Sequence, residues 1–470
     1  MSLFRELKTR VYEIVHSSKW PLICVVACLI VWLTCVIAFS YPGKPTGDTI
    51  GQLQQAVAGN IDNWKPALYA YILKLFNYAC GDKSLGAAFI LQVVLFGLGY
   101  ALIVWSFAKK SKAFLWAMPF IFFCNSKGIN ITDIGNDALC ASCFMMYFGL
   151  IFAHRVMTCK TINVVCVICA IICLFVGFVM RHNSFPAVIV MATCALIPFC
   201  KSLARSITCG VLLSISFLVL NLLIVNLIFQ CRATYPLRFV YAADMINISI
   251  LNNEWENFCQ QEQLHTNEKY PSPSSYCLLR ADVCNFYPTG LNPFFKEADS
   301  ETLKYINDRY FEGWCQSVIN NPEKYLLLKT YFFHQFLLAG RSLPIVEAWI
   351  SHQFPHVSTY GDTICHDWRA WCNRLFLFNS LIPLIGYALL AIFLVLAYLK
   401  KIILKEESRD ALFIIGAAAS YLVTFSIFTL SSTEFRFYII TSCLSLIGVL
   451  LLLISVFCNR FASAPPKDAR

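Results

Sequence analysis

The chain has 470 residues, of which 58% are hydrophobic and 14% are charged, and its mean hydropathy is +0.63. A soluble protein carries about 25% charged residues, so this composition excludes a soluble globular protein and indicates an all-α polytopic membrane protein. The net charge of +10 does not predict a nucleic-acid partner, because the lysines and arginines gather at alternate connections between apolar segments. That arrangement is the positive-inside pattern of membrane proteins.

Ten apolar segments approach the roughly 20 residues that a helix needs to cross the hydrocarbon core. We place them near 20–40, 85–107, 113–125, 137–154, 161–180, 185–200, 207–230, 376–399, 411–430 and 437–458. The third and sixth are short. Ten spans and the basic connections predict that both termini are cytoplasmic. The expected parts are an N-terminal membrane domain (1–230), a periplasmic domain (231–373) and a C-terminal membrane region (374–470).

The first outer loop, 41–84, carries the first candidate for chemistry. Asp48 follows a glycine, and a polar run leads to Trp64, Lys65 and a proline. An apolar and aromatic stripe at helical spacing comes next and could lie in the membrane interface. We interpret this segment as an active-site loop in which Asp48 deprotonates a hydroxyl group. The alternative is an aspartate that only makes a local turn.

Charged and polar groups also occur at the outer ends of later spans. Arg181, His182 and Asn183 follow the fifth span, where the arginine could bind a phosphate through paired donors. The alternative is an arginine that extends toward the membrane interface. Glu434 and Arg436 lie between the last two spans, and charges so close to hydrocarbon are costly unless they are paired or functional.

Asp133 and Asp137 stand at the entrance to the fourth span. Asp137 could serve only to complement the helix dipole, whereas Asp133 has no such role. Lys65, Arg232 and Arg238 are outer-side cations that could meet a lipid phosphate. No P-loop, GxGxxG in context, HExxH or GxSxG motif is present, which argues against a nucleotide-driven pump or a hydrolase of those types.

Eight of the 23 cysteines fall in the expected outer segments, and an even number there favours disulfides of undetermined connectivity. They are Cys80, Cys231, Cys259, Cys277, Cys284, Cys315, Cys365 and Cys372. The alternatives are free thiols and a metal site among the histidines and cysteines of 352–372, whose spacing matches no zinc pattern.

Taken together, the layout resembles the GT-C class of membrane glycosyltransferases, which use polyprenyl-phosphate sugars. The resemblance rests on short motifs in a fixed order around Asp48, Gln52, Gln55 and Ala56, then WKPALY at 64–69, GNDAL at 135–139, RHN at 181–183 and EFRF at 434–437. Many relatives have tryptophan, histidine and two prolines in the second motif. Here Lys65 replaces the histidine and Ala67 the second proline, so no role is carried over for that histidine.

The resemblance implies an inverting transferase that moves a sugar, glucose above all, from a carrier such as undecaprenyl phosphate to an extracytoplasmic glycan. Asp48 would be the catalytic base, and Arg181, Arg436, Lys65 and Arg238 would bind the donor phosphate. The remaining candidates would contact substrate: Trp64, His182, Asn183, Asp133, Asp137 and Glu434. Members that use monophosphate donors commonly need no metal, so the resemblance implies neither a metal nor another cofactor. Enzymes that modify the O-antigen of lipopolysaccharide at the bacterial inner membrane have this size and topology.

Two other functions are consistent with the residues. One is a transporter or flippase for a lipid-linked or small polar substrate, and the other is a glycan polymerase or its partner. A transporter is expected to place charges near the middle of the membrane and to show internal repeats. Here the charges collect at the outer ends and no repeat is visible, which favours the enzyme.

Overall fold

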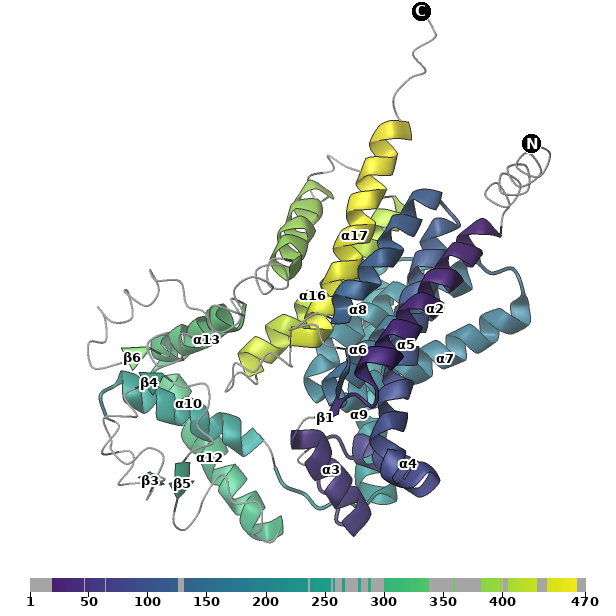
Figure 1. Ribbon diagram of the computed structural model, residues 1–470. Helices are drawn as coiled ribbons and strands as arrows, with labels where there is room; N and C mark the ends of the chain where they lie inside the picture. The colour runs from purple at the N-terminus through teal and green to yellow at the C-terminus, as the bar shows by residue number, and fades with distance from the viewer. Residues whose placement is uncertain are drawn as a thin grey trace, which may run out of the picture.

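A computed structural model describes most of the chain as helix (Figure 1). The described residues are 19–45, 47–63, 65–125, 131–235, 237–254, 257, 264–266, 278–279, 286–288, 300–337, 358–359, 382–397, 399, 405–428 and 438–462.

Apolar helices make up the main bundle. They are α2 (Trp20–Ser40), α5 (Ser84–Ala108), α6 (Asn136–Val156), α7 (Lys160–Met180), α8 (Phe185–Leu196), α9 (Leu203–Leu223), the π-helical turn η4 (Ile224–Ile228), a helix at Ile382–Ala397, α16 (Glu406–Phe428) and α17 (Tyr438–Ala462). Every expected span overlaps one of these helices or the 3₁₀ helix η2 (Lys112–Asn125).

Six helical stretches of the described chain are long and apolar enough to cross a membrane. They are Trp20–Ser40, Ala67–Ala108, Asn136–Val156, Lys160–Met180, Leu203–Ile228 and Ile439–Cys458. The protein is therefore a helical membrane protein, and the count of ten spans stays a prediction. The 3₁₀ helix η2 has only 14 residues, but at the 3₁₀ rise these extend about 28 Å, which is close to the thickness of the hydrocarbon core.

The remaining elements are further helices and strands of two or three residues. The helices are α3 (Gly47–Ala58), α4 (Ala67–Cys80), η1 (Gly81–Lys83), η3 (His182–Ser184), α10 (Leu237–Leu251), α12 (Ser300–Asn320) and α13 (Pro322–Leu337). The strands are β1 (Lys44–Pro45), β2 (Asp133–Ile134), β3 (Leu264–Thr266), β4 (Leu278–Leu279), β5 (Phe286–Pro288) and β6 (Ser358–Thr359). They pair as β1 with β2, β3 with β5, and β4 with β6.

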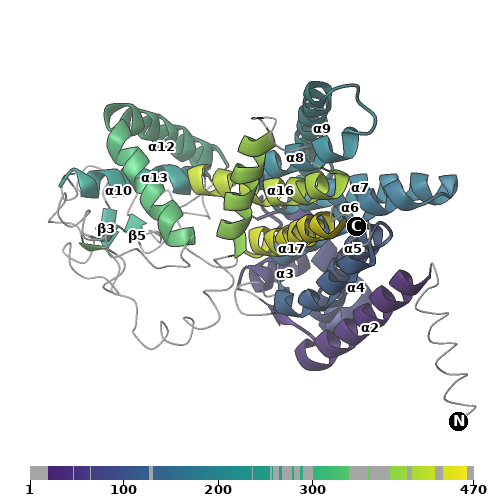
Figure 2. The ribbon, with the colours of Figure 1, turned by 90° about the horizontal axis from the view of Figure 1, so that it is seen from above.

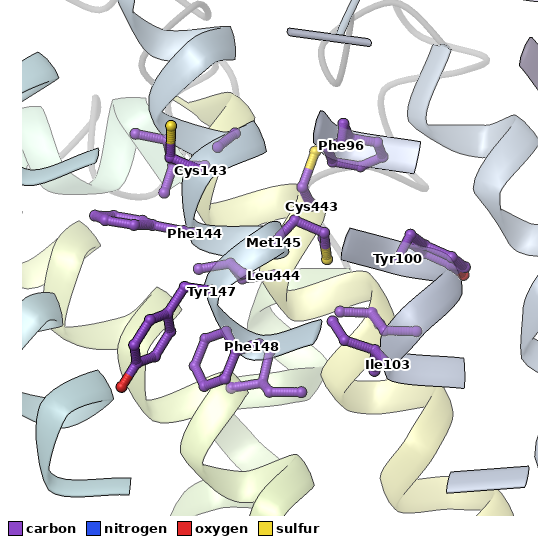
Figure 3. Close-up of a cluster of buried hydrophobic side chains, with 14 of the residues drawn as sticks. Phe96, Tyr100, Ile103, Cys143, Phe144, Met145, Tyr147, Phe148, Cys443 and Leu444 are labelled. Atoms are coloured by element: carbon purple, nitrogen blue, oxygen red, sulfur yellow. The ribbon is translucent and has the colours of Figure 1, made fainter. Parts of the chain in front are cut away.

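The core of the bundle lies where α5, α6 and α17 meet. Figure 3 shows aromatic side chains of α5 and α6 around Met145, with Cys443 and Leu444 of α17 beside them. The hydroxyl of Tyr147, which is buried here, donates to the carbonyl of Met191 in α8 (2.7 Å). This pairing satisfies a polar group that would otherwise be costly in an apolar interior.

The bundle has two ends of different character. At one end, which we call the basic end, Lys110 pairs with Glu406 (2.9 Å) and Arg155 with Asp410 (2.8 Å). Helix α2 begins and α17 ends on this side (Figure 1). The opposite end, which we call the loop end, carries α3, α4 and the β1–β2 pair. These two basic residues thus lie at the same end of the bundle, and the orientation of that end in the membrane stays a prediction.

A second group of helices, α10, α12 and α13, lies to one side of the bundle in both views (Figures 1 and 2). Its centre is polar: Lys329 and the indole of Trp314 both donate to buried Asp244, at 2.8 and 3.0 Å. Burial raises the pKa of Asp244, and Lys329 acts against that rise. Helix α13 lies within the region predicted to be a periplasmic domain.

Candidate functional site

Four of the predicted site residues line one small pocket at the loop end. Asp48 comes from α3, Asp133 from β2, Asp137 from α6 and Arg181 from the residue after α7. The wall is completed by Gly135, Asn136, Ala138 and Ile439. Segments separated by more than 80 positions in the chain therefore contribute to a single polar hollow.

Parallel pairing of β1 with β2 joins the first and second outer loops. Lys44 is the partner of Asp133 and Pro45 that of Ile134. Gly43 lets the strands approach, since its φ is +88° and a Cβ there would lie 2.6 Å from Phe89 and 2.8 Å from Ile134. A side chain at this position would strain the backbone and collide with its neighbours.

Two buried polar side chains fix the strand pair against the helices. The hydroxyl of Thr49 in α3 donates to the carbonyl of Ile134 (2.6 Å). The Nε2 of Gln92 in α5 donates to the carbonyls of Ile131 and Asp133, at 2.6 and 3.0 Å. These bonds satisfy carbonyl groups that irregular backbone leaves without a helical partner. They hold Asp133 and the start of α3 in place.

Asp48 lies in the first turn of α3, where the helix dipole favours a negative charge. The ammonium group of Lys65 is 2.9 Å from its Oδ2. Both side chains are about one-third exposed, at 31% for Asp48 and 28% for Lys65. The predicted base and a predicted phosphate-binding cation are therefore direct neighbours at the mouth of the site.

The turn that brings Lys65 back to Asp48 is held by glutamines of α3. The Nε2 of Gln52 donates to the carbonyl of Pro66 (3.2 Å), and the Nε2 of Gln55 to Asp62 (2.9 Å). Both glutamines belong to the first motif of the family resemblance. Their position gives them a physical role, which is to close the α3–α4 turn.

Asp137 and Arg181 form a second, more buried pair. Both oxygens of Asp137 accept from the guanidinium group of Arg181, through Nε and one terminal nitrogen. Their side chains are only 9% and 18% exposed. Burial by itself lowers the pKa of Arg181, but the Asp137 carboxylate more than offsets this and the pKa is raised. Asp137 thus does more than complement the dipole of α6.

Asn136 adds an unsatisfied acceptor to the pocket wall. Its side chain is buried, and its Oδ1 has no hydrogen-bond partner within the described part of the chain. A buried acceptor without a donor costs about 1–3 kcal/mol, so such groups often mark a place for a ligand hydroxyl or a water. The pocket holds about 20 Å³, enough for one such group.

The segment after η4 is attached to the first outer loop. Asn63 Oδ1 accepts from both the backbone and the hydroxyl of Thr234, at 2.7 and 2.8 Å. The rings of Tyr71 and Phe229 stack with centroids 3.8 Å apart. Arg238 follows at the start of α10, fully buried, and desolvation lowers its pKa to about 10. It is not among the residues that line the pocket.

The other candidates are placed in part or not at all. Asn183 lies half-buried in η3 next to Arg181, and His182 belongs to the same short helix. Trp64, Glu434 and Arg436 lie outside the described residues. Of the eight outer cysteines, Cys80, Cys231 and Cys315 are free thiols, and the other five lie outside the described residues.

Gln92, Thr49 and Asn136 complete the site but were not predicted as part of it. Gln92 was detectable, because it is the one amide in the long apolar run of α5. Asn136 was also detectable, because it belongs to the GNDAL motif at 135–139. The role of Thr49 was not predictable from the sequence, because a hydroxyl residue beside an aspartate is common at the start of a helix.

The arrangement offers carboxylate acceptors and the amide oxygen of Asn136 to ligand hydroxyl groups, with two cations close by. Within the described residues, no group of three or more His, Cys, Asp or Glu side chains is placed to hold a metal ion. No family model, curated protein or solved structure matches the chain.

Proposed function

We propose that this protein is an inverting glycosyltransferase that moves a sugar from a polyprenyl-phosphate carrier to a hydroxyl of a glycan outside the cytoplasm. The observation that carries the proposal is the shared pocket of Asp48, Asp133 and Arg181, with Lys65 in contact with Asp48. A carboxylate beside cations at a membrane surface suits the transfer of a sugar from a lipid phosphate.

Asp48 takes the proton of the acceptor hydroxyl, and the hydroxyl oxygen attacks the anomeric carbon. The bond from that carbon to the phosphate oxygen breaks, so the configuration inverts and polyprenyl phosphate leaves with both electrons of the bond. Negative charge grows on the leaving phosphate, where fixed cations in a site of low dielectric have their largest effect. Lys65 and Arg181 lie close enough to Asp48 and the pocket to serve in that role, and Asn136 can accept from a different hydroxyl of the bound sugar.

The finer assignment follows the family resemblance. The sugar is glucose, the carrier is undecaprenyl phosphate, and the acceptor is an O-antigen. The loop end faces the periplasm of a bacterial inner membrane, with both termini cytoplasmic. The positions of the basic end and the pocket at opposite ends of the bundle are consistent with this orientation.

The test is transfer in proteoliposomes that contain a polyprenyl-phosphate sugar donor and a glycan acceptor. Asp48→Asn keeps the shape of the side chain and removes the base, so transfer should fall by about 10²–10⁴-fold while donor binding persists. Asp82→Asn is the matched control, because Asp82 is an exposed carboxylate in the same outer loop. Equal transfer by the wild type and Asp48→Asn would remove Asp48 from the mechanism.

The donor panel separates the enzyme from its main alternative. Glucose, galactose and N-acetylglucosamine carried on polyprenyl phosphate are compared in parallel. Transfer from one donor that depends on Asp48 supports the proposal. Movement of a lipid-linked sugar across the bilayer, with no transfer from any donor, would replace it with a flippase.

A further inference from the structure

A cavity of about 570 Å³ lies at the basic end, away from the candidate site. It is bounded by α8, α9, α16 and the helix Ile382–Ala397. Its walls are mostly apolar and include Val190, Leu203, Leu390, Leu394, Leu412 and Phe413. Leu203 and Leu394 are 57% and 54% exposed, so the groove opens toward the surface that contacts lipid.

One end of this groove is polar and cationic. Lys201 and Arg409 line it together with Ser202 and Ser206. Lys201 comes from the α8–α9 connection and Arg409 from the first turn of α16, so two separate segments bring positive charge to the same place.

These two cations differ from their neighbours at the basic end. Lys110 and Arg155 are in ion pairs with acidic residues of α16. Among the described residues, no acidic side chain forms an ion pair with Lys201 or Arg409. The Nε of Arg409 is buried and makes no hydrogen bond to that part of the chain. The charge of Arg409 acts on Glu406 and Asp410 nearby, but its buried Nε still lacks an acceptor, which is costly and which a bound anion would supply.

We propose that this groove is a binding site for an anionic phospholipid of the surrounding bilayer. The phosphate lies between Lys201 and Arg409, and an acyl chain lies along the leucines of the groove. Arginine suits a phosphate because its planar donors can bind two oxygens at once. Basic pockets between membrane helices near a cytoplasmic surface bind anionic headgroups by the same electrostatics.

The test is equilibrium binding of phosphatidylglycerol and phosphatidylcholine to the full chain in detergent micelles, with bound lipid counted by native mass spectrometry. We expect the wild type to prefer phosphatidylglycerol. Lys201→Gln and Arg409→Gln should each weaken that lipid by about five-fold, with little change for phosphatidylcholine. Arg205→Gln is the matched control, since Arg205 is exposed near the same end but does not line the groove.

A second variant tests the apolar part. Gly416 lines the groove, and a Cβ there would meet Val190 at an ordinary 3.6 Å, so Gly416→Leu fills the space without a backbone collision. It should weaken phosphatidylglycerol binding although no charge is lost.

Three results would each overturn the proposal. One is equal affinity of the wild type for both lipids. Another is a loss in Arg205→Gln as large as in Arg409→Gln, because the attraction would then be diffuse surface charge. The last is complete displacement of the lipid by millimolar inorganic phosphate, which would indicate a site for free phosphate.

Discussion

At the scale of single residues, the loop end contains two ion pairs whose burial differs. Asp48 and Lys65 are each about one-third exposed, whereas Asp137 and Arg181 are mostly buried. An exposed pair contributes about 0–1 kcal/mol to stability, because water and salt screen it. Breaking a buried pair by removing one partner costs about 3–5 kcal/mol, because the other charge stays in a site of low dielectric. Mutation of the exposed pair should therefore affect function with little loss of stability, whereas mutation of the buried pair should reduce stability.

Lys65→Met is expected to leave stability almost unchanged while it reduces sugar transfer. The ion pair with Asp48 is lost, which should cost at most about 1 kcal/mol of unfolding free energy. Loss of a cation beside the reacting groups should reduce transfer on the order of 10²-fold. Thermal unfolding in detergent and the proteoliposome assay measure the two effects. Lys83→Met, an exposed lysine of η1, serves as the control. A large fall in melting temperature with unchanged transfer would make Lys65 purely structural.

Asp137→Asn should destabilise the protein by about 3–5 kcal/mol, because it leaves the guanidinium group of Arg181 without its charged partner. The double variant Asp137→Leu and Arg181→Leu removes both charges. It should be destabilised by less than the sum of the losses of Asp137→Leu and Arg181→Leu made singly. A double-mutant cycle on melting curves measures this coupling. Additive losses would mean that the pair contributes nothing as a pair.

At the scale of elements, α5 and α6 pack with their backbones in contact. A Cβ on Gly149 would lie 2.5 Å from the carbonyl oxygen of Gly99, and a Cβ on Gly99 would meet the backbone of Met145 and Met146. Small residues at such crossings let membrane helices approach closely and pack by van der Waals contact. The close approach matters to the site, because α5 carries Gln92 and α6 carries Asp137.

Gly99→Ala should therefore destabilise the bundle, since backbone atoms cannot move aside as a flexible side chain would. We expect a loss of about 1–3 kcal/mol, as for other overpacked positions. Gly51→Ala is the matched control: Gly51 lies inside α3 with nothing within 4 Å of a Cβ, and alanine there should stabilise by about 0.5–1 kcal/mol. Melting temperatures of the two variants should move in opposite directions. A shift of the same sign in both would contradict the close packing of α5 against α6.

Helices were predictable from the sequence where the length of an apolar run determines that it spans the membrane. An apolar run of 21 residues such as α7 can satisfy its backbone in a bilayer only as a helix. The short segment Lys112–Asn125 was harder, because it contains Pro119 and folds as a 3₁₀ helix. Asp48 and Arg181 were predictable as single candidates from their places at span ends. Lys65 and Asp137 were candidates too, but their pairing with Asp48 and Arg181 was not predictable, because the pairs join residues 17 and 44 positions apart and depend on how helices pack.

At the scale of the whole molecule, the helices carry charged groups to both ends of the bundle. The loop end gathers Asp48, Asp133 and Arg181, and the basic end gathers Lys110 and Arg155 with their acidic partners. The helices α5, α6 and α7 connect these ends. If these helices cross the membrane, the loop end and the basic end face opposite compartments. Orientation in the membrane therefore determines which compartment the candidate site can serve.

Two native cysteines can report that orientation. Cys80 ends α4 at the loop end, and Cys159 lies between α6 and α7 at the basic end; both are exposed free thiols. A membrane-impermeant maleimide applied to intact cells with a permeabilised outer envelope should modify Cys80 and spare Cys159, because exposed thiols react and the bilayer excludes the reagent. Lysis should expose Cys159. Peptide mass spectrometry assigns each modified site, and Cys166, which is buried in α7, is the internal control. Modification of Cys159 alone before lysis would invert the orientation, place the pocket in the cytoplasm and remove extracytoplasmic glycans as its acceptors.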